Sequence, residues 1–82
     1  MTATQFIESN NGKVLSFHKF KHETDKYGRG GEIEKRWKID YNNKIYWLKL
    51  VGNCASVEHN SNLLITFTTL QNALNTIFIK LN

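Results

Sequence analysis

One segment, Glu32–Tyr41 (EIEKRWKIDY), constrains the fold of this chain more than any other part of it. Ile33, Trp37 and Ile39 fall on one side of an extended backbone, and every acidic side chain of the segment falls on the other. A strict period of two predicts a β-strand with one wet face and one mostly buried face. The rest of the chain must therefore supply partner strands and a cover for the buried face.

Further strands flank this segment on both sides. Lys13–Lys21 (KVLSFHKFK) alternates imperfectly, and the break near His18 predicts a bulge or a strongly bent strand. Asn42 and Asn43 suit a tight hairpin turn, because Asn tolerates positive φ. The turn leads into Lys44–Val51 (KIYWLKLV), which is apolar on both faces and is therefore predicted to be central or to have its outer face covered. A helix at the N-terminus is the candidate cover.

The two ends of the chain predict the remaining elements. Thr2–Glu8 has the pattern of a short helix that begins with a capping box at Thr2. After a polar connection over residues 52–62, Leu63–Phe67 predicts a fourth strand. A helical turn then precedes Thr76–Leu81, which predicts a fifth strand. Three aromatic residues are expected in the core: Phe17, Trp37 and Phe67.

Composition excludes several classes of protein. At 82 residues, with 40% hydrophobic and 22% charged side chains, the chain is expected to form one globular domain over residues 1–82. The single cysteine, Cys54, excludes a disulfide framework and a Cys-rich zinc site. No apolar run approaches the roughly 20 residues that cross a bilayer, and no signal-peptide pattern is present. We therefore expect no membrane association.

The positive charge is concentrated in the middle of the chain. The net charge is +4, and residues 13–49 contain ten basic and five acidic side chains. A one-sided basic surface attracts phosphate backbones or acidic proteins. The alternative is a solvated face that only confers solubility, and the interleaved acids weaken the case for nucleic acid.

Two groups of residues resemble sites that perform chemistry. His18 and His22 lie four residues apart, and in an extended strand this spacing is about 13 Å, too far for one metal ion. Cys54 and His59 contain the residue types of a nucleophile and a base, but nothing near them marks an oxyanion hole or a third orienting group. We therefore expect no metal, no cofactor and no catalytic site.

The loop His22–Gly31 (HETDKYGRGG) is polar and rich in glycine. No Lys-Ser/Thr pair follows Gly28–Gly31 and the next element is a strand, so the loop is not a nucleotide-binding loop of the familiar kind. It is either a flexible hairpin tip or a recognition loop in which Lys26, Tyr27 and Arg29 reach a partner.

The predicted order of elements resembles an SH3-like barrel, in which a single helical turn separates the last two of five strands. The segments LLITFTTLQNALNTIFIKL (63–81) and Trp37–Val51 carry this resemblance. The opening QFIESNNGKVLSFHKF (5–20) looks like that of small phage-type SH3-like barrel proteins, although the loop His22–Gly31 is longer and richer in glycine. The resemblance implies a small binding module without a built-in catalytic site, and it fixes no ligand.

We therefore predict a mainly β fold with minor α: a single five-stranded, SH3-like, partly open barrel. It has a short N-terminal helix and a helical turn before the last strand. The expected function is a non-enzymatic basic module of phage or mobile-element origin, acting in the cytoplasm of a bacterial host. Its partner would be nucleic acid or a nucleic-acid-handling protein complex. The alternative is a protein–protein inhibitor of a host defence enzyme, similar to an anti-CRISPR protein.

A third hypothesis, a small hydrolase or nuclease that uses His18, His22 or Cys54, is the least favoured. For the binding module, seven residues are expected to contact the partner. They lie on the glycine-rich loop, on the polar face of the alternating segment and along the following strand: Lys26, Tyr27, Arg29, Arg36, Lys38, Lys44 and Lys49.

Overall fold

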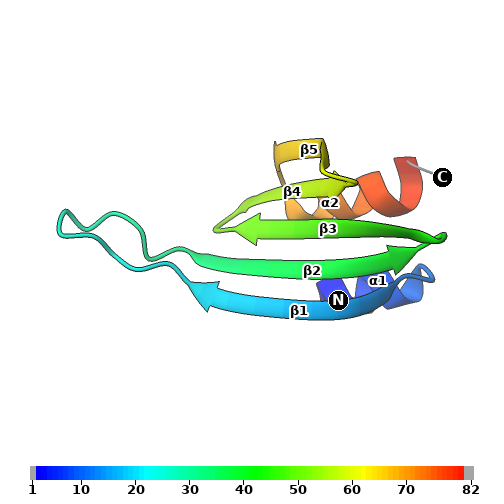
Figure 1. Cartoon of the computed structure of the whole chain (residues 1–82), viewed down its shortest axis with the longest axis horizontal. Coiled ribbons are helices and arrows are strands. Elements are labelled where there is room, and N and C mark those ends of the chain that lie inside the picture. Colours follow the sequence, from blue (N-terminus) through cyan, green and yellow to red (C-terminus); the bar gives the residue numbers. More distant parts are fainter. Residues whose placement is uncertain (1, 81–82) are drawn as a thin grey trace.

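Five antiparallel strands and two short helices make up the fold in a computed structural model, which describes residues 2–80 (Figure 1). The mainly β architecture with a short N-terminal helix and a C-terminal helical turn is confirmed. In chain order the elements are α1 (Ala3–Ser9), β1 (Lys13–Lys21), β2 (Ile33–Tyr41), β3 (Lys44–Val51), β4 (Cys54–His59), β5 (Asn62–Thr68), α2 (Leu70–Asn75) and a π-helical turn, η1 (Thr76–Lys80).

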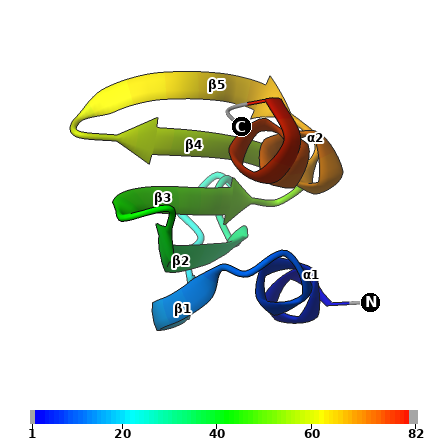
Figure 2. The same ribbon diagram turned by 90° about the vertical axis from the view of Figure 1, so that its right-hand side faces the viewer.

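The strands follow one another across the sheet in the order β1-β2-β3-β4-β5. Because β1 and β5 are its opposite edges, the sheet is not closed, as expected for a partly open barrel. Both helices lie against the same side of the sheet, which we call the helix-side face, and no described helix covers the opposite side, the open face (Figure 2). The loop between β1 and β2 projects well beyond the sheet, so the molecule measures 44 × 22 × 21 Å (Figure 1).

The core fills the space between the helix-side face and the helices. Alternate residues of β2, β3 and β4 point into it, as a period of two requires. Ile7 of α1 is fully buried against them, and Gly12 lets the chain pass close by, since a Cβ there would lie 2.8 Å from Ile7 Cγ2. The buried apolar residues are Ile7, Trp37, Ile39, Tyr46, Leu48, Ala55, Val57, Ala73, Leu74, Ile77 and Phe78.

Local sequence signals explain how the elements begin and turn. The capping box at the start of α1 is present, with the Thr2 hydroxyl accepting from the backbone of Gln5. Asn42 and Asn43 both have positive φ, of 54° and 61°, which is the geometry of a type I′ hairpin turn. None of the described helices is long and apolar enough to span a bilayer.

Two predicted elements at the C-terminal end are wrong. Residues 52–62, predicted as a polar connection, contain β4 (Cys54–His59). Residues 76–80, predicted as a strand, are helical, and Leu81 lies outside the described residues. Ala73, Leu74, Ile77 and Phe78 are all buried, and their spacing places them on one face of a continuous helical segment. The helical segment therefore follows the last strand instead of preceding it.

Three further expectations about packing are corrected. Phe67 is not in the core but is 87% exposed, and Phe17 is only half-buried, with its ring centroid 5.1 Å from that of Trp37. The bulge in β1 lies between Val14 and Ser16 and not near His18. The N-terminal helix packs on the helix-side face, so it leaves the outer face of β3 uncovered.

Candidate functional site

The open face carries cations and aromatic rings side by side. The strand register places Arg36 opposite Lys49 and Lys38 opposite Trp47. We call these four residues the open-face cluster. The Nζ of Lys38 lies 5.5 Å from the centre of the Trp47 ring, so the cation rests against an exposed indole. This arrangement leaves both a flat ring and a positive charge available to solvent.

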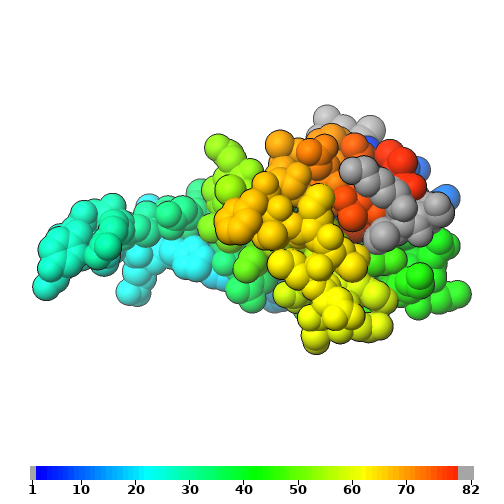
Figure 3. Space-filling view, turned by 90° about the horizontal axis from the view of Figure 1, so that it is seen from above, coloured from blue at the N-terminus to red at the C-terminus, as the bar shows by residue number. Residues whose placement is uncertain are grey.

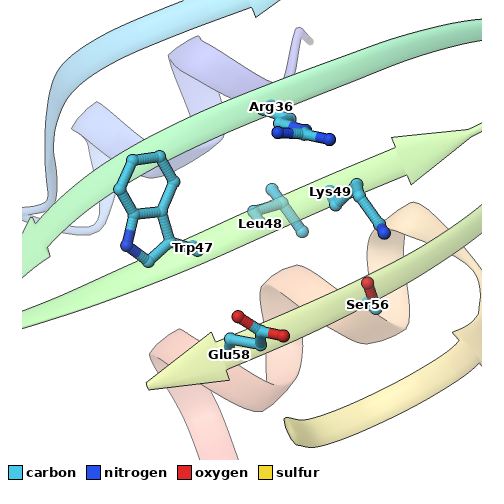
Figure 4. A pocket seen from close by; sticks show the side chains of 6 residues that line it. All are labelled: Arg36, Trp47, Leu48, Lys49, Ser56 and Glu58. Carbon is cyan, nitrogen blue, oxygen red and sulfur yellow. The ribbon is translucent and has the colours of Figure 1, made fainter. Parts of the chain in front are cut away.

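A shallow hollow of about 370 Å³ lies over the same strands. Figure 4 shows Arg36 from β2, Trp47 and Lys49 from β3, and Ser56 and Glu58 from β4 around it. Glu58 is the register partner of Trp47. The hollow is therefore lined by one carboxylate, that of Glu58, and by two cations, Arg36 and Lys49. The hollow therefore offers hydrogen-bond donors, an acceptor and an aromatic wall, but little excess charge.

A buried carboxylate organises the end of the open face nearest the loop. Glu34 is only 3% exposed, and its Oε1 lies 3.0 Å from Nε2 of His22. Since an ionised carboxylate only accepts hydrogen bonds, His22 donates this one, and Nε of Arg36 donates to the other carboxylate oxygen. Phe20 completes the group, because its ring lies 5.4 Å from that of His22 and 5.3 Å from the Arg36 guanidinium carbon.

Burial alone would raise the pKa of Glu34. The hydrogen bonds and charges of His22 and Arg36 outweigh this effect, so its pKa lies below the ordinary value for a glutamic acid. A carboxyl group with a lowered pKa stabilises the folded state above its unfolded pKa, and this contribution is lost as the pH falls through the folded pKa. Glu34 thus fixes Arg36 in place at neutral pH and releases it in acid.

Glu34→Gln is expected to lower the free energy of unfolding at neutral pH by about 1–3 kcal/mol, because a charged acceptor is lost in a buried site. The difference between wild type and variant should shrink in acid, as the pH falls below the ordinary pKa of a glutamic acid and through the lowered pKa of Glu34, because the native carboxyl is then protonated as well. Urea denaturation at several pH values measures both effects. Glu32→Gln is the matched control, since Glu32 is exposed. An equal loss in both variants would contradict the role of Glu34.

The tip of the β1–β2 loop is held by one aspartate. Oδ1 of Asp25 accepts hydrogen bonds from the backbone N–H groups of Tyr27, at 2.8 Å, and Arg29, at 2.9 Å. Oδ2 accepts from Nε of Arg29 at 3.1 Å. The backbone bond from Arg29, aided by those from Tyr27 and the Arg29 side chain, lowers the pKa of Asp25. The loop is thus organised at its tip by specific bonds.

These bonds display an aromatic ring between two cations. Tyr27 is exposed, with Lys26 Nζ 5.0 Å and the Arg29 guanidinium carbon 5.2 Å from the ring centre. Gly30 permits the return of the chain, because its φ is +95° and a Cβ would lie 2.3 Å from the carbonyl oxygen of Glu23. The tip is therefore a second candidate contact surface, separate from the open face (Figure 1).

The structure divides the seven predicted contact residues into groups. Arg36, Lys38 and Lys49 come together on the open face, and Lys26, Tyr27 and Arg29 come together at the loop tip. Lys44 joins neither group. It pairs with Tyr41 beside the β2–β3 turn, at the end of the sheet away from the β1–β2 loop. Its position in the alternation of β3 is that of residues on the helix-side face.

Sequence reasoning omitted two parts of this surface from the predicted contacts. Trp47 is not among the seven predicted contact residues, although its odd position in β3 puts it on the same face as Lys49. Phe20, His22 and Glu34 were not connected at all. The pairing of Phe20 with Glu34 across β1 and β2 would have been the signal, but it depends on the register after the bulge.

The candidate catalytic pair, Cys54 and His59, does not assemble. Cys54 and His59 are at opposite ends of β4, about 16 Å apart along an extended strand. His59 Nδ1 donates a hydrogen bond to the carbonyl oxygen of Ile45 at 2.9 Å, which holds the His59 ring against β3 and away from Cys54. Among residues 2–80 no three His, Cys, Asp or Glu side chains are grouped so that they could hold a metal ion.

Similarity to known proteins does not narrow the function further. Comparisons with protein-family models, with curated proteins and with solved structures give no match to this chain.

Proposed function

We propose that the protein is a non-enzymatic module that binds single-stranded nucleic acid, alone or within a nucleoprotein complex, on its open face. The observation that supports this most directly is the pairing of exposed rings with cations there: Trp47 with Lys38, and Phe20 with Arg36. Bases stack on exposed aromatic rings, and neighbouring cations neutralise the phosphates between them.

The geometry favours a single strand over a duplex. The two rings lie on β1 and β3, two strand spacings or about 10 Å apart across the sheet. Their β2 partners, Glu34 and Lys38, are four residues apart, so the rings are also separated by about 13 Å along the strands. Unpaired bases expose the flat surfaces that such rings require, whereas the bases of a duplex are stacked on one another. The hollow beside Trp47 adds hydrogen-bonding groups for base edges, namely Ser56 and Glu58.

Stacking is expected to contribute more to affinity than charge does. Glu34 already occupies the guanidinium of Arg36, and Glu58 lines the same hollow as Lys49. Binding should therefore depend on salt, with a slope set by a few phosphate contacts. The resemblance to phage-type SH3-like proteins adds a phage or mobile-element origin and a site of action in the bacterial cytoplasm.

The test is direct. Fluorescence anisotropy with a labelled single-stranded RNA or DNA oligonucleotide should show binding at low salt that weakens as the salt concentration rises, with the modest slope that a few phosphate contacts give. A duplex of the same sequence serves as the comparison and should bind more weakly. Absence of binding to either single strand at low salt would overturn the proposal.

The organised loop tip favours a second candidate, a protein–protein inhibitor of a host enzyme that handles nucleic acid. Tyr27 and Arg29 are presented on a projection away from the sheet, and aromatic and arginine side chains are common anchors of protein interfaces. The double variant Tyr27→Ala, Arg29→Ala should abolish recovery of a host protein in a pull-down treated with nuclease. Recovery that is unchanged in the variant would contradict this second function.

A further inference from the structure

The edge strand β5 is unlike the rest of the surface. It is the last strand of the sheet, and no other strand among residues 2–80 pairs with its outer edge (Figure 2). An edge strand exposes N–H and C=O groups that can pair with another strand. Figure 3 looks onto this edge and shows β5, in yellow to orange, lying at the surface of the molecule. Two register shifts interrupt the pairing of β5 with β4, and the outer edge of β5 has no partner strand among the described residues.

The side chains along this edge are apolar and exposed. Leu63 is 55% exposed, Leu64 is also exposed, and Phe67 is the most exposed large apolar residue that the structure describes. Phe67 also has a φ of 52°, in the left-handed region that a bulky residue adopts only at a cost. The left-handed backbone lies at the register shift between Ala55 and Val57 of β4, and it leaves the ring turned to solvent, where a partner can cover it.

The distribution of charged residues indicates what kind of partner β5 can bind. Residues 60–79 contain no Lys, Arg, Asp or Glu, whereas the other edge strand, β1, carries Lys13, Lys19 and Lys21. Two copies of a chain with a net charge of +4 repel each other over most of their surface. Two β5 strands, in contrast, can approach each other without this repulsion, because β5 itself contains no charged side chain. A partner selected by charge would instead bind at the basic end of the molecule.

We propose that β5 is a self-association surface, through which two copies of this chain pair as antiparallel strands about a two-fold axis. Antiparallel pairing brings the end of one strand beside the start of the other, so Phe67 of each copy packs near Leu63 and Leu64 of its partner. The two-fold axis is perpendicular to the sheet. Only a rotation about such an axis reverses the direction of β5 and leaves the open faces of both copies on the same side. The dimer therefore presents both open faces on one side of a continuous sheet.

Sedimentation equilibrium of the purified chain over a range of concentrations tests this surface. The wild type should reach twice the mass of the chain as its concentration rises. Leu63→Lys places a charge on the edge strand and should keep the protein at the mass of one chain. The matched control is Leu15→Lys, since Leu15 is an exposed leucine on the opposite edge strand and its variant should still dimerise.

Phe67→Asn is a second variant, chosen so that a loss of dimer can be distinguished from a loss of folding. Asn tolerates the left-handed backbone, so the fold is retained while the ring is lost. It should weaken the dimer at least tenfold, with an unchanged circular dichroism spectrum. Hydrogen exchange gives an independent measurement, because the backbone amides of β5 should become protected only at concentrations where the dimer forms. A wild type that remains monomeric throughout, or a dimer that Leu15→Lys disrupts and Leu63→Lys does not, would overturn the proposal.

Discussion

Trp47→Ala is expected to weaken the binding of a single-stranded oligonucleotide roughly tenfold to a hundredfold, because stacking of one base on an exposed ring contributes about 1–3 kcal/mol. Trp47 is 42% exposed, and its ring is flanked by Lys38 on the same face. Removal of the ring takes away the stacking surface and leaves every cation of the open face in place. The loss should therefore appear at all salt concentrations, with the salt slope nearly unchanged.

Phe17→Ala is the matched control for this measurement. Phe17 is 46% exposed but points to the helix-side face, where it lies against Trp37. Its replacement should reduce stability slightly and leave the affinity for the oligonucleotide within about twofold, since coupling between distant sites is small. If the two variants lose the same affinity, or if Phe17→Ala loses more, the open face is not the binding surface. Thermal melts of both variants separate a loss of binding from a loss of folding.

The sequence predicts the sheet well where alternation is strict and fails where apolar runs are short. The period of two in β2 and the two asparagines after it determine a central hairpin, and the structure contains both. Strand β4 was missed because only Ala55 and Val57 of its residues are buried. The run at 76–80 contains β-branched and aromatic residues, but its burial continues the helical spacing of Ala73 and Leu74. Tertiary packing overrides local propensity in that segment.

The candidate site is predictable in part for the same reason. Alternation alone puts Arg36 and Lys38 on one face of β2, but only the register with β3 brings Lys49 and Trp47 opposite them. Lys44 precedes Trp47 by three residues and so has the opposite orientation, which alternation would already have indicated. The order of the loop tip depends on side-chain to backbone bonds from Asp25, and no periodic pattern reports such bonds.

Replacement of the three open-face cations provides the sharpest test of where the nucleic acid lies. The triple variant Arg36→Gln, Lys38→Gln, Lys49→Gln should reduce the slope of log affinity against log salt by about 1.4 to 2, since each phosphate contact to a single strand contributes roughly 0.7 and Glu34 already pairs with Arg36. Affinity at low salt should fall by more than about tenfold, because the released counterions drive binding most strongly there. Anisotropy titrations at several salt concentrations measure both quantities.

A second triple variant distinguishes the effect of where the cations lie from the effect of the net charge of the protein. Lys19→Gln, Lys21→Gln, Lys44→Gln removes the same number of cations, all exposed and all with the alternation of the helix-side face. If the chain binds through its overall charge, both triples lose equally, because long-range attraction depends on the sum of the charges. If it binds through the open face, the second triple keeps most of its slope, because those lysines contact no phosphate. A larger loss in the second triple would place the nucleic acid on the other side of the sheet and contradict the assignment of Arg36, Lys38 and Lys49.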